Sequence, residues 1–379
     1  MLFIKNGHLK TMSGDDIQNG CLLIGDNGKI TYVGENIEAP ADAEVIDAQG
    51  MLVTPGCVEA HCHIGLGDLS GSDCNESSSQ ITPEMRAIDG INPQNDVFKN
   101  AIKGGITSVC TGPGSANIIG GTFAAIKCYG KRVDDMIIKN PVAMKCAFGE
   151  NPKKAHGQGG KAPKTRMATA ALLREFLYKA KKYYNDKQSG LNPAFDFRLE
   201  SMLPVMAGEI PLKAHVHRAD DIFTAIRIAK EFNLKMTLDH CTDGSLITDE
   251  LAKEGYPVLA GPYMTGVSKY EVLNKSFTTP ADLYAAGVDI AIITDAGVVQ
   301  IQYLPLLAGI AVKSGLPYDE AWKAITINPA TLTGIGDRVG SLEVGKDGDV
   351  VIWQADPLRE INADPLVTVI DGKVVYRAE

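Results

Sequence analysis

The sequence predicts an α/β protein in which a TIM-like (β/α)8 barrel is joined to a small β-sandwich domain built by both chain termini. Three observations predict this fold. Both ends are rich in strand-like runs, the middle alternates strand-like with helical patterns, and 379 residues suffice for one large and one small domain. The expected boundaries are 1–54 and 336–379 for the two parts of the sandwich, and 55–335 for the barrel.

The terminal segments have the pattern of β-hairpins. Near the N-terminus, the turn Asp26-Asn27-Gly28 separates runs rich in Val, Ile and Tyr, which is a hairpin signal. The C-terminal runs GSLEVGKDGDVVIW and PLVTVIDGKVVYR show the same pattern of strand-like runs separated by glycine-containing turns. Two β-rich ends around a different middle predict one sandwich that both ends share.

The middle of the chain contains eight strand-like runs, most of them followed by a helical pattern, as in a barrel of typical size (~250 residues). The third and fourth units are the least regular. The stretch 65–93 is a long polar insertion, a kind of loop that is usually functional or mobile. The strand-like runs are 58–61, 107–111, 123–127, 142–147, 212–215, 236–240, 258–261 and 288–294, and the helical patterns are 95–103, 166–185, 220–232, 246–254, 280–286 and 304–313.

Composition limits the classes of partner. A formal net charge of -9 argues against nucleic acid or an anionic membrane, because both require a basic surface. Eight cysteines without a CxxC pair favour reduced thiols in the cytosol. The start of the chain lacks a secretory signal, and the longest apolar run is shorter than the ~20 residues of a membrane span. We expect a cytoplasmic homo-oligomer that acts on a small-molecule substrate.

Metal-type ligands recur at the ends of the strand-like runs. His61 and His63 are two residues apart, on the same side of an extended segment. His215, His240 and Asp295 end later runs, and barrel active sites are built at that face. Five of the seven histidines lie at such ends, which chance explains poorly.

These residue types fit a hydrolytic metal site. Neutral imidazoles suit zinc, and a carboxylate completes a site that leaves one position open for water; manganese, iron and nickel accept the same ligands. The metal would lower the pKa of that water to about 7. Asp295 would then accept the proton and pass it to the leaving group.

The chain resembles the amidohydrolase superfamily of metal-dependent hydrolases, and within it the imidazolonepropionase-like branch that also contains prolidase-like enzymes. The resemblance covers nearly the whole chain, including LVTPGCVEAHCHIG, TINPATLTGIGDRVGSLEVGKDGDVVIW and the closing VIDGKVVY. It implies that His61, His63, His215 and Asp295 bind a metal. It also implies that His240 binds a second metal in a binuclear site, or contacts the reactive water in a mononuclear one.

The resemblance makes Lys145 the residue that decides the metal count, because binuclear members often use a carboxylated lysine on the fourth strand as a bridging ligand. A buried lysine loses its charge readily, and its neutral amine can take up carbon dioxide. The alternative is a lysine that extends to the barrel rim or packs by its stem. Glu150 is a rival oxygen ligand or a substrate contact.

Three further residues have weaker assignments. The family pattern leaves His217 to meet the substrate, with a polar histidine at the rim as the alternative. His156, in the loop 149–160, is a candidate to close over an anionic substrate, although such loops are more often mobile surface. Asp239 precedes a predicted ligand, but on a regularly alternating strand it would point to the other side.

The sequence therefore predicts a metal-dependent amidohydrolase that cleaves a C–N bond in a small molecule, in an amide, a cyclic amide or a dipeptide-like compound, outside the usual substrates of endopeptidases. It would use one or two divalent metals, zinc first, to activate water. One alternative is a deaminase of a heterocyclic C=N, which a mononuclear site with a neutral Lys145 would favour. The other is a non-catalytic scaffold of the same fold. Specificity is expected in the loops 70–93 and 149–164.

Overall fold

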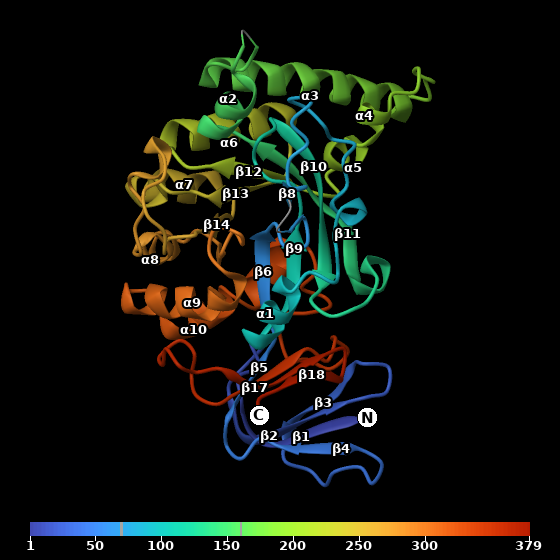
Figure 1. The fold of residues 1–379 in the computed structure, drawn as a ribbon, viewed down its shortest axis with the longest axis vertical. Coiled ribbons are helices and arrows are strands. Elements are labelled where there is room, and N and C mark those ends of the chain that lie inside the picture. Colours follow the sequence, from blue (N-terminus) through green and yellow to red (C-terminus); the bar gives the residue numbers. More distant parts are fainter. Residues whose placement is uncertain (69–70, 160) are drawn as a thin grey trace.

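The computed structural model describes residues 1–68, 71–159 and 161–379 of the chain. It has two parts: a sheet built from both termini, and a barrel above it whose upper end is covered by helices (Figure 1). Positions 70 and 160, which belong to the two predicted specificity loops, lie outside the described residues. The described residues contain no helix that is both long and apolar enough to cross a membrane.

The terminal sheet joins the two ends of the chain through the antiparallel pair β16 and β5, in which Val351 lies opposite Thr54. It is one hydrogen-bonded sheet that branches at β1, because β4 and β5 pair with successive halves of that strand. Both arms bury side chains in a common apolar cluster, as the faces of a sandwich do. The strands are β1 (Leu2–Leu9), β2 (Ile17–Ile24), β3 (Ile30–Glu35), β4 (Glu44–Asp47), β5 (Leu52–Pro55), β16 (Val350–Trp353), β17 (Pro365–Ile370) and β18 (Lys373–Arg377).

The barrel is an eight-stranded sheet whose strands follow one another in chain order. Each of the eight strand-like runs overlaps one observed strand. The end strands β6 and β15 approach each other, and Glu59 links them because its Oε2 accepts hydrogen bonds from Thr294 N (2.8 Å) and Thr294 Oγ1 (2.6 Å). The barrel is therefore nearly closed. Its strands are β6 (Cys57–Cys62), β9 (Ile106–Thr111), β10 (Ile119–Lys127), β11 (Ile137–Ala147), β12 (Leu212–Val216), β13 (Met236–His240), β14 (Val258–Ala260) and β15 (Ile290–Ile292).

The third barrel strand departs from the predicted (β/α)8 pattern. Strand β10 runs antiparallel to both β9 and β11. A short connection from β9 can only return antiparallel, since parallel neighbours need a crossover of a dozen or more residues. The link from β10 to β11 holds only the 3-10 turn η2 (Val133–Met136). Strict alternation of strands and helices therefore does not hold in this irregular part of the sequence.

The six predicted helical patterns match α1 (Val97–Lys103), α3 (Arg166–Gln188), α6 (Ala219–Phe232), α7 (Thr248–Glu254), α8 (Thr279–Ala285) and α9 (Leu304–Lys313). Helix α3 crosses the upper end of the molecule (Figure 1). The segment predicted as a loop over 149–160 contains a helix, α2 (Glu150–His156), and the insertion 65–93 contains the hairpin β7 (Gly67–Asp68) and β8 (Gly71–Ser72). The remaining elements are α4 (Phe197–Glu200), α5 (Leu203–Met206), α10 (Tyr318–Lys323), α11 (Ile327–Leu332), η1 (Ala87–Asp89), η3 (Gly244–Leu246), η4 (Tyr270–Val272) and η5 (Ile301–Tyr303).

A buried ion cluster connects the barrel to the terminal sheet. The Lys127 ammonium, at the end of β10, lies 2.9 Å from Asp347 Oδ2 and 2.7 Å from Asp349 Oδ2. Arg338 Nη2 lies 2.7 Å from the same Asp347 oxygen. The predicted boundary after residue 54 falls at the end of β5, and the one after 335 falls beyond α11; both boundaries stay predictions.

Candidate metal centre

The end of β6 supplies the first group of ligands. The ligand atoms of His61, His63 and Asp295 all lie within 4.8 Å of one another. His63 Nε2 is 3.2 Å from Asp295 Oδ1, and His63 Nδ1 lies 2.7 Å from the carbonyl oxygen of Gly112, to which it donates. A donor bond from one ring nitrogen fixes the tautomer that leaves the other free for a metal.

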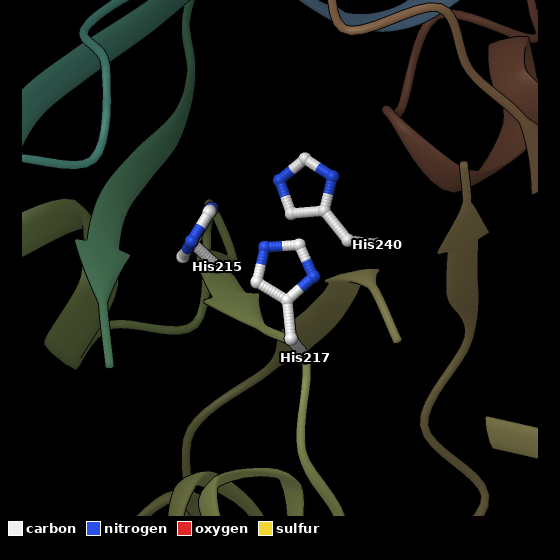
Figure 2. Close-up of side chains that lie close together, drawn as sticks. All are labelled: His215, His217 and His240. Atoms are coloured by element: carbon white, nitrogen blue, oxygen red, sulfur yellow. The ribbon is translucent and has the colours of Figure 1, made fainter. Parts of the chain in front are cut away.

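The ends of β12 and β13 supply a second group. The rings of His215, His217 and His240 come together (Figure 2), with their ligand atoms again within 4.8 Å of one another. His240 Nδ1 donates to the carbonyl oxygen of Gly261 at 2.8 Å, so its Nε2 is the free nitrogen. His217, which the sequence assigned to the substrate or to the rim, is thus placed as a possible third ligand of this group.

Lys145 on β11 lies beside the first group. Its side chain is fully buried, which excludes the alternative in which it extends to the barrel rim, and its Nζ is 3.2 Å from His61 Nε2. Burial lowers the pKa of Lys145 to about 8, although the carboxylates of Asp239 and Asp295 oppose that shift. A large fraction of the amine is therefore neutral in mildly alkaline solution.

Both groups fit divalent cations. Burial, above all, lowers the pKa of His61, His215 and His217 well below the usual value, and that of His240 to about 4. These four imidazoles are therefore neutral, as metal ligands must be. His240 Nε2 and Asp295 Oδ1 are buried atoms without a hydrogen-bond partner among the described residues. Unsatisfied buried acceptors are rare in proteins, and a bound cation would satisfy both of these atoms.

Asp239 lies behind the first group. Its Oδ2 is 2.7 Å from His61 Nδ1, and its Oδ1 accepts a hydrogen bond from Thr237 Oγ1 (2.8 Å). The alternation expected from the sequence breaks at the end of β13, because His240 has a φ of 74°. This left-handed residue lets both Asp239 and His240 face the barrel interior.

The two groups lie at a cavity of about 580 Å³. Its lining includes all of the proposed ligands except the fully buried His61 and Lys145. Asn151, Lys269 and Lys275 add polar atoms to the wall, and Val267, Val272 and Val298 make part of it apolar. The cavity can therefore hold a small molecule next to both ligand groups.

The comparisons with known proteins identify the family. Residues 52–375 match the Amidohydrolase family. The chain belongs to the amidohydrolase family. The crystal structure of an amidohydrolase from Thermotoga maritima MSB8 is 38% identical with a TM-score of 0.95, and the alignment covers 100% of both chains.

Two curated relatives support the family, and one of them supports the imidazolonepropionase-like branch. The amidohydrolase tasK of Hapsidospora irregularis is 30% identical over 93% of this chain, which spans only 39% of the length of that protein. The imidazolonepropionase of Maricaulis maris (strain MCS10) is 24% identical over 94% of both chains. The family and the branch predicted from the sequence are confirmed.

Two predicted substrate contacts lie elsewhere in this amidohydrolase. Glu150 Oε1 accepts a hydrogen bond from Glu271 N (3.1 Å), which ties the start of α2 to η4. His156 is buried, with its Nε2 2.8 Å from Asn117 Oδ1. Neither residue is among the described residues that line the cavity. Both therefore hold loops in place in this structure.

Other residues at the cavity were missed by the sequence analysis. Asn151 Nδ2 lies 3.3 Å from His215 Nε2, and its Oδ1 accepts a hydrogen bond from Lys269 Nζ (2.9 Å). Lys275 lines the same wall. Asn151 directly follows Glu150, which the sequence suggested as an oxygen ligand or substrate contact, and it is Asn151 that lines the cavity. The lysines follow β14 in a loop that carries no motif.

Proposed function

We propose that this chain is a metal-dependent amidohydrolase that cleaves a C–N bond of an amide, cyclic amide or dipeptide-like small molecule. The observation that carries the proposal is the pair of ligand groups at one cavity, with three ligand atoms each and two buried atoms that have no hydrogen-bond partner within the described part of the chain. Three protein ligands are the usual number in a catalytic zinc site.

The chain would hold one cation with His61, His63 and Asp295, and a second with His215, His217 and His240. A bound divalent metal supplies Lewis acidity, which makes water reactive near neutral pH and polarises a carbonyl group. Asp295 lines the cavity; burial alone would raise the pKa of its carboxyl, but contact with His63 and the positive charges of the neighbouring histidines and Lys145 together keep that pKa below the usual value. Asp295 is therefore a carboxylate that accepts a proton from water and passes it to the leaving nitrogen.

The test combines metal analysis with a panel of substrates. The purified chain is analysed for zinc, manganese, iron and nickel. It is then assayed on N-acyl amino acids, dipeptides and cyclic imides, with aminated heterocycles included to detect deamination. We expect bound metal, hydrolysis of at least one amide class, and loss of that activity with a chelator.

The variant Asp295→Asn should lower kcat by about 10²–10⁴-fold, the usual contribution of general acid–base catalysis. Asp289→Asn, an exposed carboxylate next to β15, is the matched control and should retain activity. Release of ammonia from heterocycles alone would replace the proposal with the deaminase. A chain that binds no metal, and hydrolyses nothing after zinc or manganese is added, would be a scaffold.

A further inference from the structure

Lys275 places an ammonium group in the wall of the candidate active site, where no carboxylate of the described residues is in ion-pair contact with it. The residue follows β14 and η4 and lines the same cavity as His240 and Asp295. Its Nζ donates to Thr265 Oγ1 and lies 3.5 Å from the carbonyl oxygen of Gly266. Among the described side chains, no carboxylate lies within 4.0 Å of this nitrogen.

The neighbouring lysine of the same loop shows the contrast. Lys269 also lines the cavity, but its Nζ lies 2.6 Å from Glu271 Oε1 and donates to Asn151 Oδ1 at 2.9 Å. Its charge is compensated by a carboxylate that is itself buried. Of the two lysines that line the cavity, Lys275 is thus the one whose charge is left for a ligand.

The surroundings of Lys275 make its unpaired ammonium energetically unfavourable. The side chain is half-buried, and burial, followed by the nearby charge of Lys269, lowers its pKa, although the carboxylate of Asp295, beyond ion-pair distance, opposes that shift. An ammonium that loses water without gaining a counter-ion is unfavourable, and an anion that enters the cavity removes that cost. Val267, Val272 and Val298 also line the cavity, so the ligand meets apolar surface as well.

We propose that the substrate carries an anionic group that pairs with Lys275, on an aliphatic body that packs against the valines of the cavity wall. The inference rests on the proposed function and narrows its substrate class to amides or cyclic amides that bear a carboxylate or a phosphate. A lysine acts as a compact point charge and lacks the planar fork of arginine, so it accepts either anion.

The kinetic test compares matched pairs of substrates. Dipeptides and N-acyl amino acids with a free carboxylate are assayed beside the same compounds with a C-terminal amide, and phosphate monoester analogues form a third arm. Lys275→Met should raise KM for the anionic compound of each pair by about 10- to 100-fold, which is the usual effect of losing one hydrogen bond to a charged group. KM for the neutral member should stay unchanged.

Two further variants control this result. Lys275→Arg keeps the charge and should restore part of the affinity for the anionic member. Lys253→Met removes an exposed ammonium from α7 and should change neither KM. If wild type prefers the neutral member, or if Lys275→Met affects both members equally, the inference is wrong. The arm that responds to Lys275→Met shows whether the anion is a carboxylate or a phosphate.

A binding experiment separates this inference from the proposed function. Glutarate and phenyl phosphate are titrated into wild type and Lys275→Met, and binding is followed by calorimetry. Anion binding that depends on Lys275, in a chain that hydrolyses no amide, would support the anion site and overturn the hydrolase. Hydrolysis of neutral amides without any anion binding would support the hydrolase and overturn the anion site.

Discussion

Asp239 offers a sharp test of how the barrel positions its ligands. Its carboxylate is fully buried between His61 Nδ1, at 2.7 Å, and the ammonium of Lys213, at 3.3 Å. Lys213 is also buried, and its other acceptor is the carbonyl oxygen of Ala60 at 3.1 Å. Asp239→Asn therefore removes a charge that both orients a ligand and neutralises a buried cation.

The two effects have different magnitudes and different readouts. Breaking a buried ion pair by removing one partner costs about 3–5 kcal/mol, because the remaining charge stays buried. Loss of a carboxylate behind a metal-binding histidine lowers metal affinity by about 10–100-fold. Asp239→Asn should show both losses, the first in urea denaturation and the second in a competition titration of zinc against a chromophoric chelator.

The double variant Asp239→Asn with Lys213→Met separates these effects. The methionine removes the unpaired charge next to the ring of Phe123, so folding stability should return towards that of wild type. Zinc affinity should stay low, because His61 still lacks its partner. If the double variant bound zinc as tightly as wild type, the assignment of Asp239 as a positioning residue would be refuted.

Two further predictions concern Lys145 and the ion cluster between barrel and sheet. Above pH 8, where the Lys145 amine is largely neutral, bicarbonate should raise the metal content of wild type from one to two per chain but leave Lys145→Met unchanged; a wild type insensitive to bicarbonate would contradict the carbamate. The pKa of Asp347 is lowered to about 2, because Lys127 and its other cationic neighbours outweigh burial. This stabilisation is complete above pH 4 and is lost as the pH falls towards 2. In urea denaturation Asp347→Asn should therefore lose about 1–2 kcal/mol at pH 5, a difference from wild type that shrinks at lower pH, whereas the exposed control Asp337→Asn should not.

The sequence predicted the strands and the ligand positions because both depend on local patterns. Apolar runs of strand length predicted all eight barrel strands. His61, His215 and Asp295 stand at the ends of such runs, and that position indicated them as candidate ligands. The direction of a strand is not a local property, since a buried run reads the same in either orientation. The antiparallel course of β10 was therefore missed, although the irregular spacing around it was visible.

The residues that surround the ligands depend on tertiary structure, so the sequence could not place them. Asp239 faces inward because it is paired with His215 on the neighbouring strand, and the positive φ at His240 turns the next side chain inward as well. The fold alone brings the Lys275 loop to the cavity. His217 was recognised as a neighbour of His215 but assigned to the substrate. Strand alternation puts both on the same side, and the approach of His240 completes a three-imidazole group.

The presence of His217 in the second group changes the role that Lys145 would have, from a required ligand to a charge next to the first group. With His217, each group has three ligand atoms of its own, so neither needs a lysine to reach the number that a catalytic cation requires. The Lys145 ammonium, 3.2 Å from His61 Nε2, would repel a cation in the first group. A neutral amine removes that repulsion, and a carbamate replaces it with attraction and could bridge two cations. In the proposed metal centre, the charge state of Lys145 would thus set how many cations bind, while the histidines and Asp295 would set where they bind.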